Sequence, residues 1–289
     1  MNARRLLACA ALAAAAGCAG QGGAPQAALP AKRLQAIEVN NRATQLAQRG
    51  DYAAAAGEYR RALEIERSTE NEDGIAANLI NLSIVYQRMG DRNAARAAVA
   101  EILNDTALRF PPGRVAEAAL RSAILLADER QPEAAAKALE RARAACPGAC
   151  ALRGKMDNVA AQLALLQGQP EAARTAASRA LGENRSRNDR EETANSLRLL
   201  GAVALESGKP AEAAPLAAEA LDIDKQLAVP AKIFRDLVLL GRAAKASGRT
   251  DEASQYLGRA LAVARAAGDR NAVAEVQSLM AGAPASSGR

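Results

Sequence analysis

A unit of about forty residues recurs six times along the chain, and this recurrence restricts the possible folds more than any other feature. Each copy has a turn residue, an Ala five positions later, and an apolar pair or an Ala about twelve positions after the turn. The turns fall at Gly50, Gly90, Arg130, Gly168, Gly208 and Gly248, at spacings of 40, 40, 38, 40 and 40 residues. Self-similarity at such a period is typical of solenoids, in which each unit packs only on its neighbours.

The residue types within each unit predict two antiparallel helices. Gly at the turn ends the first helix because it adopts the left-handed conformation without a Cβ clash. Pro132, Pro170 and Pro210 fit the first position of the second helix, where a missing N–H costs nothing. Small residues at fixed positions let the two helix axes approach. They are Ala43, Ser83, Ala123, Ala161, Gly201 and Gly241 in the first helices, and Ala55, Ala95, Ala135, Ala173, Ala213 and Ala253 in the second.

Composition agrees with thin helical layers. Aromatic residues make up 2% of the chain and Trp is absent, while the hydrophobic fraction of 49% is carried mainly by Ala and Leu. Such a chain lacks the bulky side chains that fill a thick core, whereas Ala is the strongest helix former.

The unit resembles the tetratricopeptide repeat, and the resemblance covers roughly residues 33 to 268. In the first copy the family's positions are filled by Ala43, Gly50, Ala55, Tyr59, Ala62 and Leu63. The resemblance implies an all-α, right-handed α-solenoid of about six helical hairpins, followed by a capping helix over 269–281 and a disordered tail over 282–289. The period is longer than the standard 34 residues, as in kinesin light chains and some bacterial regulators. We expect the extra residues between repeats, as at 67–74 and 184–189.

The N-terminus reads as an export signal. Arg4 and Arg5 precede an apolar stretch, 6–16, that is too short to cross a bilayer, which takes about 20 residues. Ala15-Ala16-Gly17-Cys18 resembles the bacterial lipobox, in which the Cys is acylated and becomes the mature N-terminus. Cys9 follows a better tetrapeptide but leaves no room for an apolar stretch before it. The alternative is a secretory signal cleaved near Ala16.

Acylation at Cys18 would give a domain organisation of signal peptide 1–17, lipidated Cys and flexible tether 18–32, and solenoid 33–268. Several acyl chains hold a protein durably on a membrane, whereas a single chain does so only marginally. Ala19 follows the Cys, where an Asp signals inner-membrane retention in many Gram-negative lipoproteins. By resemblance we therefore expect a protein of the bacterial cell envelope, on the outer membrane and facing the periplasm.

Charge and residue types disfavour nucleic-acid binding and enzymatic chemistry. The net charge is +6, but the signs are mixed along every helix, without the blocks of like charge that mark nucleic-acid partners. The chain contains no His, which removes the commonest general base and the commonest zinc ligand. No glycine-rich phosphate loop precedes a helix. We expect no enzymatic activity, no cofactor, no metal site and no catalytic residue.

Cys146 and Cys150 flank a Pro-Gly turn between two repeats. In an oxidising compartment such a pair favours a structural disulfide. The disulfide would stabilise the junction between the two repeats whose turns are 38 residues apart instead of 40. Free thiols, or redox or metal use, are the alternatives. The metal alternative is weak because two thiolates without His lack further ligands.

The functional surface of such solenoids is usually the concave groove lined by the first helices. By resemblance, its positions are Asn41, Thr44, Asn81, Ile84, Arg88, Arg121, Ile124, Asn158, Gln162, Arg198, Leu205, Arg235, Arg242 and Lys245. This mixture suits a protein or peptide partner, although solvated helix faces without a function are the alternative. The carboxylate clamp of some family members is not expected, since only two of its five positions match among Asn40, Thr44, Asn81, Glu117 and Arg121.

The function expected from these features is a membrane-anchored scaffold that docks a protein partner in its groove. By analogy, anchored tetratricopeptide proteins serve pilus and secretin assembly or peptidoglycan enzymes, and fold alone does not choose among these roles. The alternative is a peptide-sensing regulatory module, and an enzyme ranks last. The sequence does not name the partner or the oligomeric state.

Overall fold

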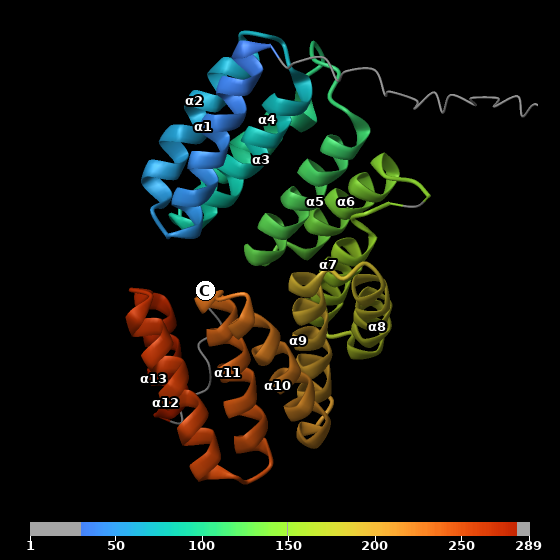
Figure 1. Cartoon of the computed structure of the whole chain (residues 1–289). Helices are drawn as coiled ribbons and strands as arrows, with labels where there is room; N and C mark the ends of the chain where they lie inside the picture. The colour runs from blue at the N-terminus through green and yellow to red at the C-terminus, as the bar shows by residue number, and fades with distance from the viewer. Residues whose placement is uncertain (1–29, 149, 282–289) are drawn as a thin grey trace, which may run out of the picture.

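The computed structural model describes residues 30–148 and 150–281 (Figure 1). The predicted signal peptide, Cys18, most of the tether and the predicted tail lie outside the described residues. Within them the chain forms thirteen α-helices and no strand. The helices are α1 Ala31–Gln48, α2 Tyr52–Arg67, α3 Glu72–Arg88, α4 Arg92–Asn104, α5 Pro112–Asp128, α6 Pro132–Ala145, α7 Arg153–Leu166, α8 Pro170–Ser186, α9 Arg190–Glu206, α10 Pro210–Gln226, α11 Pro230–Ala246, α12 Thr250–Ala266 and α13 Arg270–Met280.

Consecutive helices pack as six hairpins, and the predicted all-α solenoid is confirmed. We call α1, α3, α5, α7, α9 and α11 the A helices, and α2, α4, α6, α8, α10 and α12 the B helices. Each A helix packs on the B helix that follows it, and each B helix packs on the next A helix. The hairpins follow one another along an open arc, with α1 to α4 at one end and α11 to α13 at the other (Figure 1).

The turns between A and B helices adopt the left-handed conformation expected for them. The five glycines at these turns have φ between 69° and 87°, and Arg130 takes the same conformation with φ 56°. Arg130 is strained there, because a Cβ disfavours this region, yet the hairpin geometry imposes it. Pro132, Pro170 and Pro210 begin their B helices as predicted, and α10 continues through Pro215.

The small residues predicted at the helix crossings are buried. All twelve positions are closed to solvent, most of them completely. At Gly201, a Cβ would lie 3.0 Å from the Leu239 side chain and 3.3 Å from the Ala213 carbonyl oxygen. The close approach of the helices therefore depends on small residues at these positions. The apolar residues form a series of clusters along the array, each shared by neighbouring hairpins, instead of one central core.

Two boundary predictions are wrong. The extra residues of each repeat mostly lengthen the helices: α2 extends to Arg67, α3 begins at Glu72, and α8 extends to Ser186. The tight left-handed turns at Glu70 and Asn188 let the chain reverse within a few residues, which explains the short connections. The tether was also placed two residues too far along the chain, since α1 begins at Ala31, after Pro30.

Candidate functional site

The A helices form the inner layer of the arc. α3, α5, α7 and α9 each contact the next A helix, whereas no comparable contacts join the B helices of the described chain. Elements approach one another most closely on the inner side of a curve. The A helices therefore line the concave face, and the B helices line the convex face.

All fourteen predicted groove residues lie on A helices, but they differ in exposure. The exposed ones are Asn41, Ile84, Arg88, Arg235, Arg242 and Lys245. Those that are buried or half-buried are Thr44, Asn81, Arg121, Ile124, Asn158, Gln162, Arg198 and Leu205. Most of this second set bonds or packs within the solenoid, so the first set forms the surface available to a partner.

Arg121 ties α5 to α3. Its Nε donates a hydrogen bond to Ser83 Oγ at 3.2 Å, and its Nη2 donates to the Ser83 carbonyl oxygen at 3.1 Å and to Gln87 Oε1. Burial lowers the pKa of Arg121 to about 10, so the guanidinium remains charged at neutral pH. Its main role is therefore to join the second and third hairpins.

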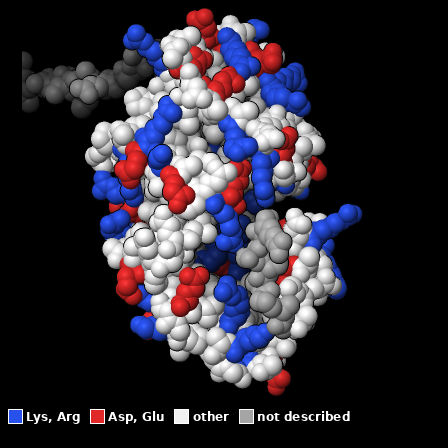
Figure 2. All heavy atoms as spheres, turned by 180° about the vertical axis from the view of Figure 1, so that it is seen from behind, with Lys and Arg blue, Asp and Glu red and all other residues white. Residues whose placement is uncertain are grey.

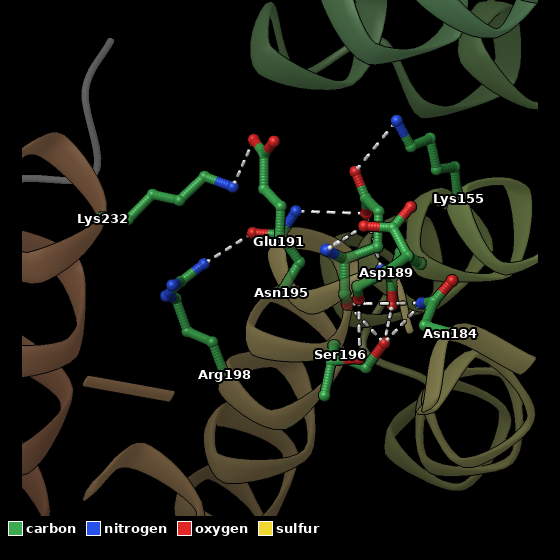
Figure 3. Close-up of polar contacts among 11 residues, drawn as sticks. Lys155, Asn184, Asp189, Glu191, Asn195, Ser196, Arg198 and Lys232 are labelled. Carbon is green, nitrogen blue, oxygen red and sulfur yellow. Dashed lines mark hydrogen bonds and ion pairs between the residues drawn. The ribbon is translucent and has the colours of Figure 1, made fainter. Parts of the chain in front are cut away.

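Asn158 belongs to a buried network that joins α7, α8 and α9. Its Oδ1 accepts a hydrogen bond from Ser196 Oγ at 2.7 Å, and its Nδ2 donates to the Glu192 carbonyl oxygen at 3.1 Å. Asn184 from α8 donates to the same Ser196 hydroxyl at 3.1 Å (Figure 3). These partners saturate Asn158, which is only 6% exposed.

Arg198 holds two buried carboxylates, Asp224 from its own hairpin and Asp236 from the next one. Its Nε donates to Asp236 Oδ1 at 2.6 Å, and its Nη2 bonds Asp224. Both aspartates are fully buried, and one oxygen of each has no hydrogen-bond partner among the described residues. Burial raises the pKa of Asp236 to about 7, with Arg198 opposing the shift and Asp224 adding to it.

These polar contacts recur at an equivalent position of the repeat. Asn40 donates to Asn78 at 2.8 Å, and the Ser196–Asn158 and Arg198–Asp236 bonds likewise join residues 38 apart. At the other two joints the first member of the pair is Ile80 or Leu120. A polar pair between consecutive A helices loses its hydrogen bond when the register shifts, so it helps to fix how adjacent hairpins dock.

The concave face encloses a hollow between the two ends of the array. We define the central hollow as the space bordered by Arg88 of α3, Asp128 of α5, Glu191 of α9 and Arg235 of α11. The charges of Arg88 and Asp128 both act on the pKa of Arg235, and Arg88 also acts on Glu191. Figure 2 shows the molecule hollowed near its middle, with Lys and Arg side chains at the floor of the hollow and at its edges.

The carboxylates of the central hollow already have partners. Asp128 accepts hydrogen bonds from Gln87 Nε2 at 2.6 Å and from Gln162 Nε2 at 3.5 Å. Glu191 accepts one from Lys232 Nζ at 2.8 Å (Figure 3). Burial alone would raise the pKa of Glu191, but Lys232 and the more distant cations lower it overall.

The guanidinium groups of Arg88 and Arg235 are in the opposite situation. Neither forms an ion pair within 4.0 Å in the part of the chain that the structure describes. Arg235 is exposed to water, yet the surrounding walls lower its pKa, and the neighbouring Arg198 and Arg88 lower it further. Among the residues from 30 to 281 that the structure describes, these two cations are therefore without an ion-pair partner, whereas Asp128 and Glu191 have hydrogen-bond partners.

Sequence reasoning missed Asp128, Glu191 and Lys232, which are absent from the predicted groove positions. A signal for them exists in the spacing. Three side-chain hydrogen bonds join residues that are 41 apart in the sequence: Gln87 with Asp128, Asp73 with Arg114, and Glu191 with Lys232. Complementary residues at a separation of one repeat plus one position therefore indicate contact between consecutive A helices.

Cys146 and Cys150 lie away from the concave face and are joined in a disulfide, with a Cα–Cα distance of 5.5 Å. A cavity of about 560 Å³ opens beside it between α6, α7 and α8. The charged residues that line it are Arg143, Arg153, Arg179, Asp157 and Glu183. Asp157 lies 3.1 Å from Arg179 and 3.6 Å from Arg143, so both of these arginines are paired within the solenoid.

Between 30 and 281, with residue 149 set aside, no three His, Cys, Asp or Glu side chains gather in a way that could hold a metal ion. Over the same residues, no helix is both long and apolar enough to cross a bilayer.

Residues 149–226 match the tetratricopeptide repeat family, and they correspond to the hairpins α7–α8 and α9–α10. These two hairpins are therefore similar to tetratricopeptide repeats in sequence, and the other four hairpins have the same arrangement of two antiparallel helices. No curated protein sequence matches the chain.

Solved structures share the fold at low sequence identity. A signal-transduction ATPase with a tetratricopeptide repeat sensor from Pyrococcus horikoshii superposes with a TM-score of 0.61 and 14% identity, over 86% of this chain and 37% of that one. Aspartyl phosphate phosphatase F from Bacillus subtilis gives 0.57 and 12%, over 89% and 82%. PilW, a type IV pilus biogenesis factor, gives 0.55 and 15%, over 84% and 98%.

Proposed function

We propose that this chain is a lipid-anchored scaffold of the bacterial envelope that binds a protein partner on its concave face. One observation carries the proposal: the A helices leave Ile84, Arg88, Arg235, Arg242 and Lys245 exposed, while their neighbours are fixed within the solenoid. A rigid layer with open apolar and cationic side chains suits recognition of a protein segment.

The fold supports a role in assembly. PilW is a type IV pilus biogenesis factor. It superposes on this chain over 98% of its own length, with a TM-score of 0.55. We propose a comparable role here, in which the solenoid holds a component of an envelope complex. Pilus, secretin and peptidoglycan machineries are the candidates.

The anchor rests on the sequence. The short apolar stretch before Cys18 and the small residues next to it support acylation, and Ala19 favours the outer membrane. In this arrangement residues 18–30 hold the solenoid away from the bilayer, on the periplasmic side.

The anchor is tested by fractionation. The full chain is expected in the membrane fraction with an acylated Cys18 by mass spectrometry. Cys18→Ser is expected in the soluble fraction. Recovery of both proteins in the soluble fraction would show that the signal is an ordinary secretory one.

The partner is tested by crosslinking in intact cells, followed by affinity purification from membranes. Ile84→Asp and Arg242→Glu, each on the concave face, are expected to reduce the crosslinked partner by about tenfold, as for the loss of one interface contact. Lys137→Glu, an exposed cation on the convex helix α6, is the matched control. A partner that is captured equally by all variants would place the interface elsewhere.

A further inference from the structure

We propose that the cavity beside the Cys146–Cys150 disulfide binds a small peptide thiol that carries carboxylates, and that this thiol exchanges with the disulfide. The inference goes beyond the proposed function and does not depend on the concave face. The cavity lies between α6, α7 and α8, has a volume of about 560 Å³, and is lined by both cysteines. Its volume falls within the range of about 300–1,000 Å³ that is usual for small-molecule sites.

The two cysteines of the bridge differ in access. Cys146 is half-buried and follows directly after α6, whereas Cys150 is only 5% exposed. In thiol–disulfide exchange a thiolate attacks one sulfur of the bridge, and the other sulfur leaves. A thiolate that enters the cavity reaches Cys146 more easily. The difference in exposure therefore assigns Cys146 as the attacked sulfur and Cys150 as the leaving one.

The carboxylates of the cavity already have partners. Asp157 is shared by Arg179 at 3.1 Å and Arg143 at 3.6 Å. Glu183 accepts a hydrogen bond from Arg187 at 2.6 Å. Neither acid is therefore free to neutralise a further cation in the cavity.

Arg153 is the cation of the cavity that remains for a ligand. In the part of the chain that the structure describes, it forms no ion pair within 4.0 Å, and its Nη2 donates to the Gly148 carbonyl oxygen. A guanidinium group binds a carboxylate through two parallel hydrogen bonds. Met156, which is 4% exposed, adds an apolar wall for the body of the ligand. A peptide thiol with free carboxylates matches this combination.

The exchange needs no added oxidant or reductant. The ligand thiolate attacks Cys146 Sγ, the bond between the two Sγ atoms breaks, and a new S–S bond joins the ligand to Cys146. The electron pair of the broken bond leaves with Cys150 as a thiolate. A neighbouring guanidinium group stabilises a thiolate, and Arg153 lines the cavity together with Cys150. Attack by Cys150 on the mixed disulfide restores the bridge, so the mixed disulfide accumulates only while the cavity holds the ligand.

The test uses the full chain with Cys9→Ser and Cys18→Ser, which leaves the bridge as its only pair of cysteines. Glutathione is compared with its diethyl ester, which has the same thiol but no free carboxylate. Reactions are quenched with acid, and the mixed disulfide is quantified by intact mass. Each rate is divided by the rate of the same thiol with hydroxyethyl disulfide, so that differences in thiol reactivity cancel. We expect glutathione to react at least about tenfold faster than the ester, with a smaller difference at high salt.

The position of the ligand is a second readout. Tandem mass spectrometry of the peptide that contains both cysteines distinguishes the two possible mixed disulfides. We expect glutathione on Cys146 and a free thiol on Cys150.

Arg153→Gln is expected to slow glutathione by about tenfold and to leave the ester unchanged, because only glutathione loses a charge-assisted contact. Arg153→Lys, which keeps the charge but not the paired hydrogen bonds, should react at an intermediate rate. Lys137→Gln, on α6 but outside the cavity, should have no effect. A variant that only loosens the connection between α6 and α7 would change the rates of both thiols alike, and circular dichroism shows whether the solenoid remains folded.

The inference is overturned if glutathione and its ester react at equal corrected rates, if Arg153→Gln changes both rates alike, or if glutathione attaches to Cys150. It is also overturned if a protein dithiol of the thioredoxin class opens the bridge and glutathione does not, since the bridge would then serve a protein partner. The proposed function is judged separately. Neither Ile84 nor Arg242 lines the cavity, so their effect on crosslinking leaves the exchange unaffected.

Discussion

At the scale of single residues, the most unusual group is the pair of buried aspartates that share Arg198. Two carboxylates within one low-dielectric site cannot both ionise easily, because each destabilises the charge of the other. Burial raises the pKa of Asp236 from 3.8 to about 7, and Asp224 adds to this shift while Arg198 opposes it. This joint between α9, α10 and α11 therefore changes its charge near neutral pH.

The raised pKa predicts that the solenoid is more stable in mild acid. Between about pH 4 and pH 7 the folded chain keeps the Asp236 proton that the unfolded chain has lost, so the free energy of unfolding falls as pH rises through this range. Going from pH 7.5 to pH 5.5 should raise the thermal midpoint by several degrees, which corresponds to about 1–2 kcal/mol. Thermal unfolding followed by circular dichroism measures the midpoint.

Asp236→Asn should flatten this dependence, since the amide does not titrate but still accepts from Arg198. Asp73→Asn is the matched control. Arg114 lowers the pKa of Asp73 through a hydrogen bond, so this group loses its stabilising effect only at more acidic pH. Equal pH profiles for the wild type and Asp236→Asn would contradict the assignment.

The sequence alone predicts which small residues lie where the helices of a hairpin cross, but it does not predict which polar residues are buried. Ala43 and Gly201 were identified from their place in the repeat, because every copy has the same geometric need there. Asp224 and Asp236 look like ordinary surface acids, because helix periodicity does not show that Arg198, 26 and 38 residues before them, bonds to both. Arg121 and Arg198 were likewise assigned to the groove, although their side chains bond within the solenoid.

At the scale of helices, close packing depends on glycines that lie inside them as well as on those in the turns. Gly154 begins α7 beside α8, and a Cβ there would come within 1.8 Å of Asn184 Oδ1. Asn184 is 2% exposed and donates to Ser196 of α9. The absence of a side chain at one position therefore lets three helices share a buried network.

Gly154→Ala is expected to lower the free energy of unfolding by about 1–3 kcal/mol, because displacing Asn184 leaves buried polar groups without partners. Gly182→Ala on the exposed side of α8 is the control, since a Cβ there meets nothing within 4 Å. That substitution should be neutral or stabilising by up to about 1 kcal/mol through helix propensity. Equal effects in urea denaturation would mean that Asn184 moves aside freely.

The first residue of a helix could be predicted better than its last residue. Pro132, Pro170 and Pro210 mark the start of a helix directly, because proline fits its first turn. The helices that end at a connection between two repeats have no comparable residue to signal where they end. At Ala228 the chain turns with φ 54° although the residue is not glycine, so the local sequence gives no warning of the tight connection.

At the scale of the whole molecule, the joint between α6 and α7 differs from the other joints. α6 packs less extensively on α7 than the other B helices pack on the A helices that follow them, and a cavity of about 560 Å³ lies beside the contact. The Cys146–Cys150 disulfide closes the connection between the two helices. Covalent bonding thus supplements packing where the array is weakest.

Replacing both cysteines, Cys146→Ser with Cys150→Ser, should lower the free energy of unfolding by about 2 kcal/mol, as estimated for a short closed loop. The weaker joint should also let the arc open, which small-angle X-ray scattering would detect as a larger radius of gyration. Cys18→Ser alone, which leaves the bridge intact, should change neither quantity. An unchanged radius in the double variant would show that helix packing alone sets the curvature.

The polar pairs between consecutive A helices have a consequence for how such a chain can evolve. Most repeat arrays tolerate duplication or loss of a unit, since each unit needs only its neighbours. Here three joints carry matched polar side chains 38 residues apart, namely Asn40 with Asn78, Asn158 with Ser196, and Arg198 with Asp236. A unit inserted between the two members of such a pair would leave buried polar groups without partners. We therefore expect selection to preserve the order of these units, whereas an insertion at the joints that begin with Ile80 or Leu120 would cost less stability.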